Sequence, residues 1–139
     1  MHSIQSYLLA LATSLLLTGC PTVDLGDQPP DVGQCRPDKT YFKDVIWPNF
    51  LASADPVRSC VGKSGCHAAD TGRSALRLSV NPVNHDTNYQ VVTRFLNCQS
   101  PLASSLLTKP LGGQDAHLGG DIFLTMADPA VADFQGWFP

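Results

Sequence analysis

Apolar positions recur at helical spacing in short stretches of this chain, separated by segments rich in Gly, Pro and Asn. The first such stretch follows Thr40, a residue type that can cap a helix. Its apolar face comprises Tyr41, Phe42, Val45, Ile46, Phe50 and Leu51. Pro48 has no backbone N–H, so we expect it to kink or end this helix.

Two further patterns occupy the middle of the chain. Leu76, Leu78 and Val80 alternate with polar residues, which predicts a short extended segment rather than a helix. A second helix is expected to follow, capped by Thr87 or Asn88. The apolar face of this helix comprises Tyr89, Val92, Phe95 and Leu96.

The last third of the chain contains the clearest helix start. Ser100-Pro101 ends the preceding helix, and residues 102–107 are expected to form a turn or two before Lys109-Pro110. Asp128 then stands at an N-cap position, with Pro129 at the first helical position. The core-facing residues behind them are Val131, Phe134 and Trp137. The predicted fold class is therefore mostly α, with short helices and long loops.

The composition narrows the range of functions. The acidic residues are all Asp, twelve of them, and the chain contains no Glu. This excludes HExxH zinc proteases, glycosidases with paired Glu residues and EF-hands closed by Glu. The net charge is −3 and the nine Lys and Arg residues are scattered, so we expect no nucleic-acid partner.

The N-terminal segment is apolar from Tyr7 to Leu17 and ends in Leu17-Thr18-Gly19-Cys20. About eleven apolar residues are too few to span a bilayer, and small residues precede the last position, as in a cleaved export segment. The segment resembles a bacterial lipoprotein signal peptide, although residues 1–6 contain no Lys or Arg. The resemblance implies that residues 1–19 are removed and that Cys20 is acylated, so that lipid holds the protein on a membrane.

The rest of the chain divides into a linker and one domain. Residues 20–38 contain Pro29-Pro30 and several Asp residues, which is typical of a flexible tether. Residues 39–139 are long enough for one small domain. Pro21, rather than Asp, follows the cysteine, and the resemblance to lipoproteins then implies the outer membrane. Export would place the other cysteines in an oxidising compartment.

The candidate chemistry lies in the segment from Cys60 to Gly65-Cys66-His67. A Cys-His dipeptide preceded by another Cys resembles the attachment motif of c-type haem. Further residues add to the likeness in order and spacing: Phe42, Val45, Ile46, Trp47, Pro48, Phe50, Leu51, Leu76, Leu78, Tyr89, Ser100-Pro101, Leu106, Leu107, Lys109-Pro110, His117, Gly119, Gly120 and Trp137. Over nearly all of residues 41–137 the chain resembles the small cytochrome-c-like domains of bacterial envelope proteins.

The resemblance implies a cytochrome-c-like helical domain with haem c as its cofactor. Cys60 and Cys66 would form the thioethers and His67 would bind the iron. The sixth ligand would be His117 or Met126, which is the only methionine left after processing. The expected function is an electron-transfer or redox-sensing module that exchanges electrons with envelope proteins, and no enzymatic turnover is expected.

The chain departs from the usual haem motif because five residues, instead of two, separate the cysteines. On a helix, two intervening residues leave the sulfurs about 60° apart, whereas five leave them about 120° apart and about 9 Å along the axis. Gly62 and Gly65 permit a path that is not helical. We therefore expect a loop that can bring the two sulfurs together.

A second account of the cysteines needs no haem. Apart from Cys20, four cysteines remain, which allow three pairings. Cys60 with Cys66 would close a short loop, and Cys35 with Cys98 a long one. If haem is attached to Cys60 and Cys66, Cys35 and Cys98 can still form a disulfide. The alternative function is a haem-free, disulfide-stabilised structural or interaction lipoprotein of an outer-membrane or envelope complex, serving transport or surface motility.

Two other patterns carry less weight. Gly62-Lys63-Ser64 resembles the end of a phosphate-binding loop, but Val57 stands where the first Gly of that loop is required, so we reject it. Asp115, His117 and Asp121 lie in a Gly-rich segment and offer a candidate metal site.

Overall fold

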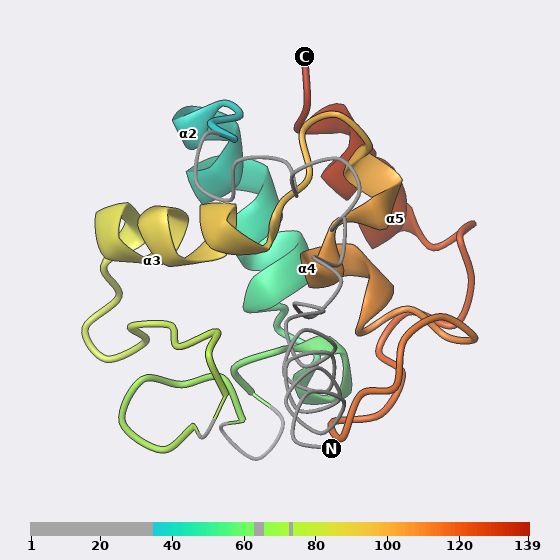
Figure 1. The fold of residues 1–139 in the computed structure, drawn as a ribbon. Coiled ribbons are helices and arrows are strands. Elements are labelled where there is room, and N and C mark those ends of the chain that lie inside the picture. Colours follow the sequence, from blue (N-terminus) through green and yellow to red (C-terminus); the bar gives the residue numbers. More distant parts are fainter. Residues whose placement is uncertain (1–34, 63–65, 73) are drawn as a thin grey trace, which may run out of the picture.

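The computed structural model describes residues 35–62, 66–72 and 74–139 (Figure 1). Over these residues the chain is mostly helical and has no sheet, because only isolated bridges pair its extended segments. This confirms the predicted mostly α class. Cys20, the signal peptide, the linker up to residue 34 and Gly65 lie outside the described residues. None of the described helices is long and apolar enough to cross a membrane.

The helical elements are short, as expected for a chain without Glu. In chain order they are α2 (Lys39–Tyr41), the π-helix η2 (Phe42–Leu51), the 3₁₀ turn η3 (Pro56–Arg58), α3 (His85–Val92), the 3₁₀ turns η4 (Thr93–Phe95) and η5 (Pro101–Ala103), α4 (Ser105–Thr108) and α5 (Pro129–Gly136).

The first helical stretch begins two residues earlier than predicted. The carboxylate of Asp38 accepts a hydrogen bond from the backbone N–H of Tyr41 and caps α2. The prediction that Thr40 is the cap is therefore wrong, because Thr40 lies inside the helix. Asp38 is also held from the far end of the chain, since the indole N–H of Trp137 donates to its carbonyl at 2.7 Å.

Pro48 does not end this helix, which continues as η2 to Leu51. The helix is wound in π-type turns from Phe42 onward, and the N–H of Ala52 bonds to the carbonyl of Trp47 at 2.7 Å. In a wider turn, each N–H reaches the carbonyl five residues back, which relieves the contact between the proline ring and the preceding turn.

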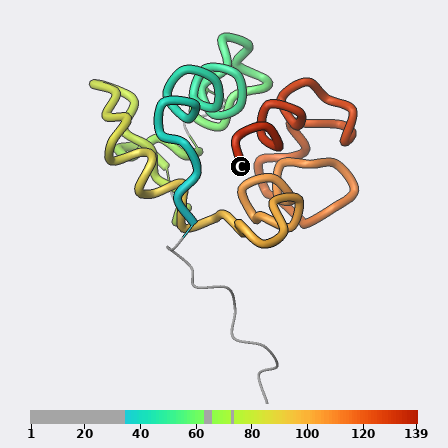
Figure 2. Tube along the Cα trace, turned by 90° about the horizontal axis from the view of Figure 1, so that it is seen from above, coloured from blue at the N-terminus to red at the C-terminus, as the bar shows by residue number. Residues whose placement is uncertain are grey.

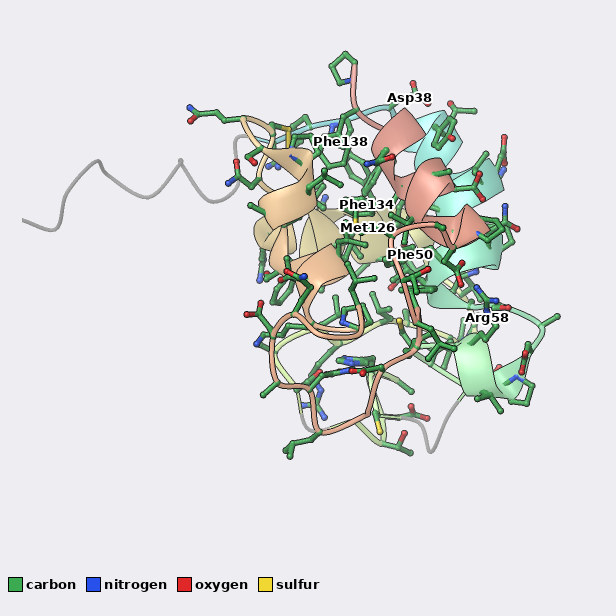
Figure 3. All side chains as sticks on the ribbon, turned by 90° about the vertical axis from the view of Figure 1, so that its right-hand side faces the viewer. Asp38, Phe50, Arg58, Met126, Phe134 and Phe138 are labelled. Atoms are coloured by element: carbon green, nitrogen blue, oxygen red, sulfur yellow. A yellow bond between two sulfur atoms is a disulfide. The ribbon has the colours of Figure 1, made fainter. Side chains whose placement is uncertain are left out.

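The core forms where η2 packs against α5 (Figure 3). The rings of Phe50 and Phe134 have centroids 5.3 Å apart, and those of Phe42 and Trp137 are 5.6 Å apart. Phe138 continues this cluster beyond Phe134 at 5.3 Å. Each aromatic side chain buries about 150–250 Å², so these contacts supply a large share of the apolar burial in a small domain.

α3 begins at Asn84, whose side chain accepts a hydrogen bond from the N–H of Thr87 at 3.0 Å. The predicted caps, Thr87 and Asn88, both lie within the helix. Asn88 is fully buried, and its amide bonds to both the N–H and the carbonyl of Ser79, at 2.7 and 2.9 Å. A residue whose type suits a helix cap is used here to fix the helix to the neighbouring extended segment.

The extended segment and the later helices follow the sequence pattern. Leu78 bridges to Ala68 in the extended segment. Residues 102–107 form η5 and most of α4. Asp128 caps α5 by accepting from the N–H of Ala130 at 3.0 Å, as predicted. The buried residues behind this cap are Val131, Phe134 and Trp137.

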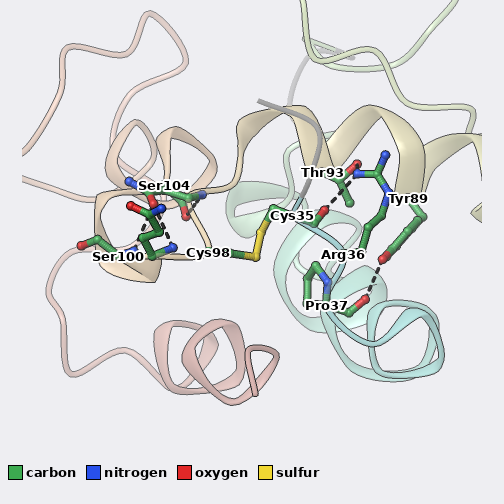
Figure 4. Close-up of a disulfide and its surroundings, with 10 residues drawn as sticks. Cys35, Arg36, Pro37, Tyr89, Thr93, Cys98, Ser100 and Ser104 are labelled. Atoms are coloured by element: carbon green, nitrogen blue, oxygen red, sulfur yellow. Dashed lines mark hydrogen bonds between the residues drawn. A yellow bond between two sulfur atoms is a disulfide. The ribbon is translucent and has the colours of Figure 1, made fainter. Parts of the chain in front are cut away.

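A disulfide between Cys35 and Cys98 ties the start of the described chain to the segment after η4 (Figure 4). Beside it, Arg36 donates to the hydroxyl of Thr93 at 3.2 Å, and the buried hydroxyl of Tyr89 donates to the carbonyl of Pro37 at 2.6 Å. The sequence left three pairings open, and the structure contains the long-range bond of one of them. Residues 35–38 are therefore bonded to the domain.

The elements lie around η2 in two groups. Viewed from above, α3 lies on one side of α2 and η2, and the C-terminal third of the chain lies on the other (Figure 2). Figure 1 shows the same division, with α4 and α5 across η2 from α3. Long loops connect these helices below η2 in that view.

We expect a Cys35→Ala/Cys98→Ala variant to lose about 4 kcal/mol of unfolding free energy, because the disulfide closes a long loop in the unfolded chain. Urea denaturation of the domain from Pro21 to Pro139 measures this loss. Reduction of the unmodified domain serves as the control and should give the same loss. Equal midpoints for the oxidised and reduced domain would contradict a stabilising disulfide.

Candidate functional site

A cavity of about 610 Å³ lies between the loops. Cys60, Cys66, His67 and His117 all line it. Much of the remaining wall is apolar and includes Ala75, Leu76, Phe95, Leu106, Pro110 and Leu118. A volume near 600 Å³ falls within the range of about 300–1,000 Å³ that is typical of cofactor sites. The structure therefore gathers four of the predicted site residues around one space.

The backbone of His67 is bonded to the extended segment that follows it. Its carbonyl accepts from the N–H of Leu78 at 2.7 Å, and the carbonyl of Leu78 accepts from the N–H of Ala69 at 2.8 Å. Gly72 closes the intervening turn, where a Cβ atom would lie 2.5 Å from the carbonyl oxygen of Cys66 and 2.6 Å from that of Ala68. Since these are backbone atoms, only Gly fits the turn.

The side chain of His67 is held in one tautomer. Its Nδ1 lies 3.0 Å from the carbonyl oxygen of Leu76 and 2.7 Å from the hydroxyl oxygen of Ser74. A carbonyl oxygen can only accept, so Nδ1 carries the proton and Nε2 keeps a free lone pair. The hydroxyl of Ser74 donates to the same carbonyl at 2.7 Å. A histidine that binds a metal is typically held by such a bond from its other nitrogen.

Burial lowers the pKa of His67 below its ordinary value, and the nearby His117 lowers it further, against the opposing effect of the hydrogen bond to Leu76. The neutral imidazole is therefore favoured at neutral pH. This is the form of histidine that binds metal ions.

His117 is held in the same way on a different loop. Its Nδ1 lies 3.0 Å from the carbonyl oxygen of Gly120, which again places the proton on Nδ1 and leaves Nε2 with a lone pair. Gly120 has a φ of 76°, a conformation that favours glycine. A Cβ atom at Gly119 would lie 2.9 Å from Cε1 of His117. The two glycines therefore leave room for this ring.

The two imidazoles face the cavity as a pair. The ring centroids of His67 and His117 are 5.9 Å apart, and the ring planes are inclined by only 19°. No group of three or more His, Cys or Asp side chains that could hold a metal ion is found in the described part of the chain. The pair alone therefore offers two nitrogen ligands.

The two cysteines differ in environment. Cys60 is buried; its N–H bonds to the carbonyl of Leu51 at 2.9 Å, and its thiol lies 3.8 Å from the carbonyl oxygen of Phe50. Burial raises the pKa of Cys60 to about 12, so the thiol stays protonated. Cys66 is exposed, and neither cysteine forms a disulfide within the described residues. Both line the cavity although five residues separate them.

The remaining predicted ligands lie elsewhere. Met126 is exposed and is not among the residues that line the cavity. Asp115 accepts a hydrogen bond from the hydroxyl of Thr108 at 2.6 Å. Over the described residues, Asp115, His117 and Asp121 do not form a group that could hold a metal ion. The candidate metal site in this loop is therefore not formed.

Sequence reasoning missed the groups that orient the two histidines. Ser74 and the carbonyl of Leu76 fix His67, and no sequence signal marks either of them as a partner of His67. Gly119 and Gly120 belong to the motif that includes His117, so their spacing could mark them as neighbours of this histidine. It gave no indication that the carbonyl of Gly120 accepts from the imidazole.

Comparison with known proteins adds no assignment: no family model matches the chain, and neither a curated protein nor a solved structure matches it.

We expect only Cys66 to react with iodoacetamide at pH 8 in the folded domain produced without haem attachment. Cys60 is buried, and a pKa near 12 leaves about one thiol in ten thousand ionised at that pH. Peptide mass spectrometry locates the label. In denaturant, both cysteines should react. If neither reacts in denaturant until a reductant is added, Cys60 and Cys66 form the disulfide of the second account.

Proposed function

We propose that this protein is a membrane-anchored envelope lipoprotein whose domain carries covalently attached haem c and transfers electrons. The observation that carries the proposal is the cavity that brings Cys60, Cys66, His67 and His117 together. Two thiols and a histidine with a free Nε2 are the groups that c-type haem attachment requires. The cytochrome-c-like sequence order gives independent support.

The residues of the cavity fit haem c by their chemistry. Cys60 and Cys66 would each add S–H across a vinyl group, forming one C–S and one C–H bond with no net oxidation. The hydrogen of each thiol would become the hydrogen of the new C–H bond. Nε2 of His67 would bind the iron, with Nδ1 donating to Leu76 to orient the ring.

The wall of the cavity suits a large planar cofactor that is apolar on its faces. The apolar side chains of Leu76, Phe95 and Leu106 exclude water from the faces. Lys109 lies on the same wall and is exposed. Its ammonium group could pair with a carboxylate of the cofactor at the edge of the cavity that faces solvent. Haem, if bound, would supply a one-electron couple of its iron, for exchange with a reduced and an oxidised carrier protein.

The lipid anchor belongs to the same proposal. The segment that ends at Cys20 would place an acyl chain at the mature N-terminus, and residues 21–34 would separate the domain from the membrane. Since Pro21, rather than Asp, follows the cysteine, the proposed location is the outer membrane. Such an anchor keeps the electron carrier close to other envelope proteins.

The first experiment is the absorption spectrum and intact mass of the domain from Pro21 to Pro139, exported in a host with cytochrome c maturation. We expect a Soret band that survives denaturation and a mass increased by one haem. His67→Ala should shift the spectrum because it removes the iron ligand, whereas His85→Ala, the control, should leave it unchanged.

A colourless domain with a mass four hydrogens below that of the reduced chain would contain two disulfides and would overturn the electron-transfer proposal. The alternative, a haem-free structural or interaction lipoprotein, would then hold. The disulfide between Cys35 and Cys98 already provides one of those two bonds.

We expect the full chain to be found in the membrane fraction with lipid on Cys20, and Cys20→Ser to remain unprocessed and without lipid. Detergent-phase partitioning and mass spectrometry of the N-terminal peptide measure this. Ser14→Ala, a change of one small residue within the apolar segment, is the matched control and should be processed normally. Normal lipidation of Cys20→Ser would contradict the assignment of the anchor.

A further inference from the structure

The loop that carries His117 is fixed at its base. The N–H groups of Ile122 and Phe123 both bond to the carbonyl of Pro110, at 2.8 and 3.0 Å. Phe123 is fully buried, with its ring centroid 4.6 Å from that of Phe50 in the core. The position of His117 is therefore determined by the core as well as by the loop itself.

We propose that His117 is the second axial ligand of the haem, opposite His67, and that the protein is therefore a closed, bis-histidine electron carrier. This inference rests on the proposed function. It assigns the residue that the sequence left open between His117 and Met126.

The separation of the two rings supports the assignment. An imidazole nitrogen binds a metal ion at about 2 Å, so two imidazoles on opposite sides of one ion have ring centroids about 6 Å apart. The observed separation between His67 and His117 is 5.9 Å. The two ring planes are nearly parallel, as in an offset stack, so the separation agrees with the assignment, and the hydrogen bonds and the shared cavity carry it.

The hydrogen bonds of the two rings give the same assignment. Each Nδ1 is bonded to a backbone carbonyl, that of Leu76 for His67 and that of Gly120 for His117. Each Nε2 therefore carries the free lone pair. The two histidines have the same tautomer and lie on two loops that line one cavity. They could therefore both bind a single haem iron through Nε2.

Met126 does not meet these requirements. Its side chain is 45% exposed, and it lies outside the wall of the cavity. The segment that carries Met126 is held on both sides, because Phe123 is buried and Asp128 caps α5.

Two histidine ligands have functional consequences. With His67 and His117 both bound to the iron, the protein would leave no ligand position for oxygen or carbon monoxide. Nitrogen in place of a thioether also lowers the potential of the iron, because methionine ligation raises it. The chain thus supports a low-potential, one-electron step in which a reduced carrier protein supplies the electron and an oxidised one removes it.

The test compares the haem-loaded domain with three variants, His117→Ala, His117→Met and Met126→Leu. Intact mass first establishes that haem is attached in each. The spin state of the ferric form, carbon monoxide binding by the ferrous form and the midpoint potential are then measured.

We expect the unmodified domain and Met126→Leu to be low-spin and to bind no carbon monoxide. His117→Ala should become high-spin and bind one carbon monoxide per haem, and His117→Met should remain low-spin with a raised potential. Attached haem with an unchanged spin state in His117→Ala, or an opened site in Met126→Leu, would overturn this inference alone. Absence of haem from the unmodified domain would overturn the proposed function and this inference with it.

Discussion

The packing of Phe50 connects the core of this domain to its candidate site. Its ring lies against Phe134 of α5 and against Phe123, which fixes the base of the loop that carries His117. Its carbonyl oxygen faces the thiol of Cys60. The side chain of Phe50 thus connects the last helix to the base of the loop that carries His117, and its backbone carbonyl lies beside Cys60. Replacing the ring with a smaller side chain would disturb the helix and the loop base, because a packed interior transmits a change in volume to its neighbours.

The sequence predicts which segments are helical better than it predicts where the helices begin. Asp128 followed by Pro129 marked the start of α5 correctly, because a proline at the first helical position identifies the residue before it as the cap. At the first helix, Asp38 and Thr40 are both suitable caps, and the bond from Trp137 to the carbonyl of Asp38 holds the backbone where Asp38 is the cap. That bond joins residues far apart in the chain, so no local pattern could indicate it.

The sequence identified the groups with metal and thiol chemistry, but not the groups that orient them. A cysteine or histidine has a distinctive side chain, and its spacing can be read directly. The carbonyls of Leu76 and Gly120, which hold the two imidazoles, have no sequence signature, since every residue carries one. The pairing of His67 with His117 likewise depends on how two distant loops pack, and only the fold shows it.

The disulfide also divides the chain mechanically. Cys35 and Cys98 close a covalent loop that contains Cys60 and His67, whereas His117 lies outside it. A tensile force applied between the N-terminus and the C-terminus is transmitted through the disulfide. It does not extend the residues between Cys35 and Cys98. Under such tension, the segment that bears Cys60 and His67 keeps its ends together, and strain falls first on the part of the chain that carries His117.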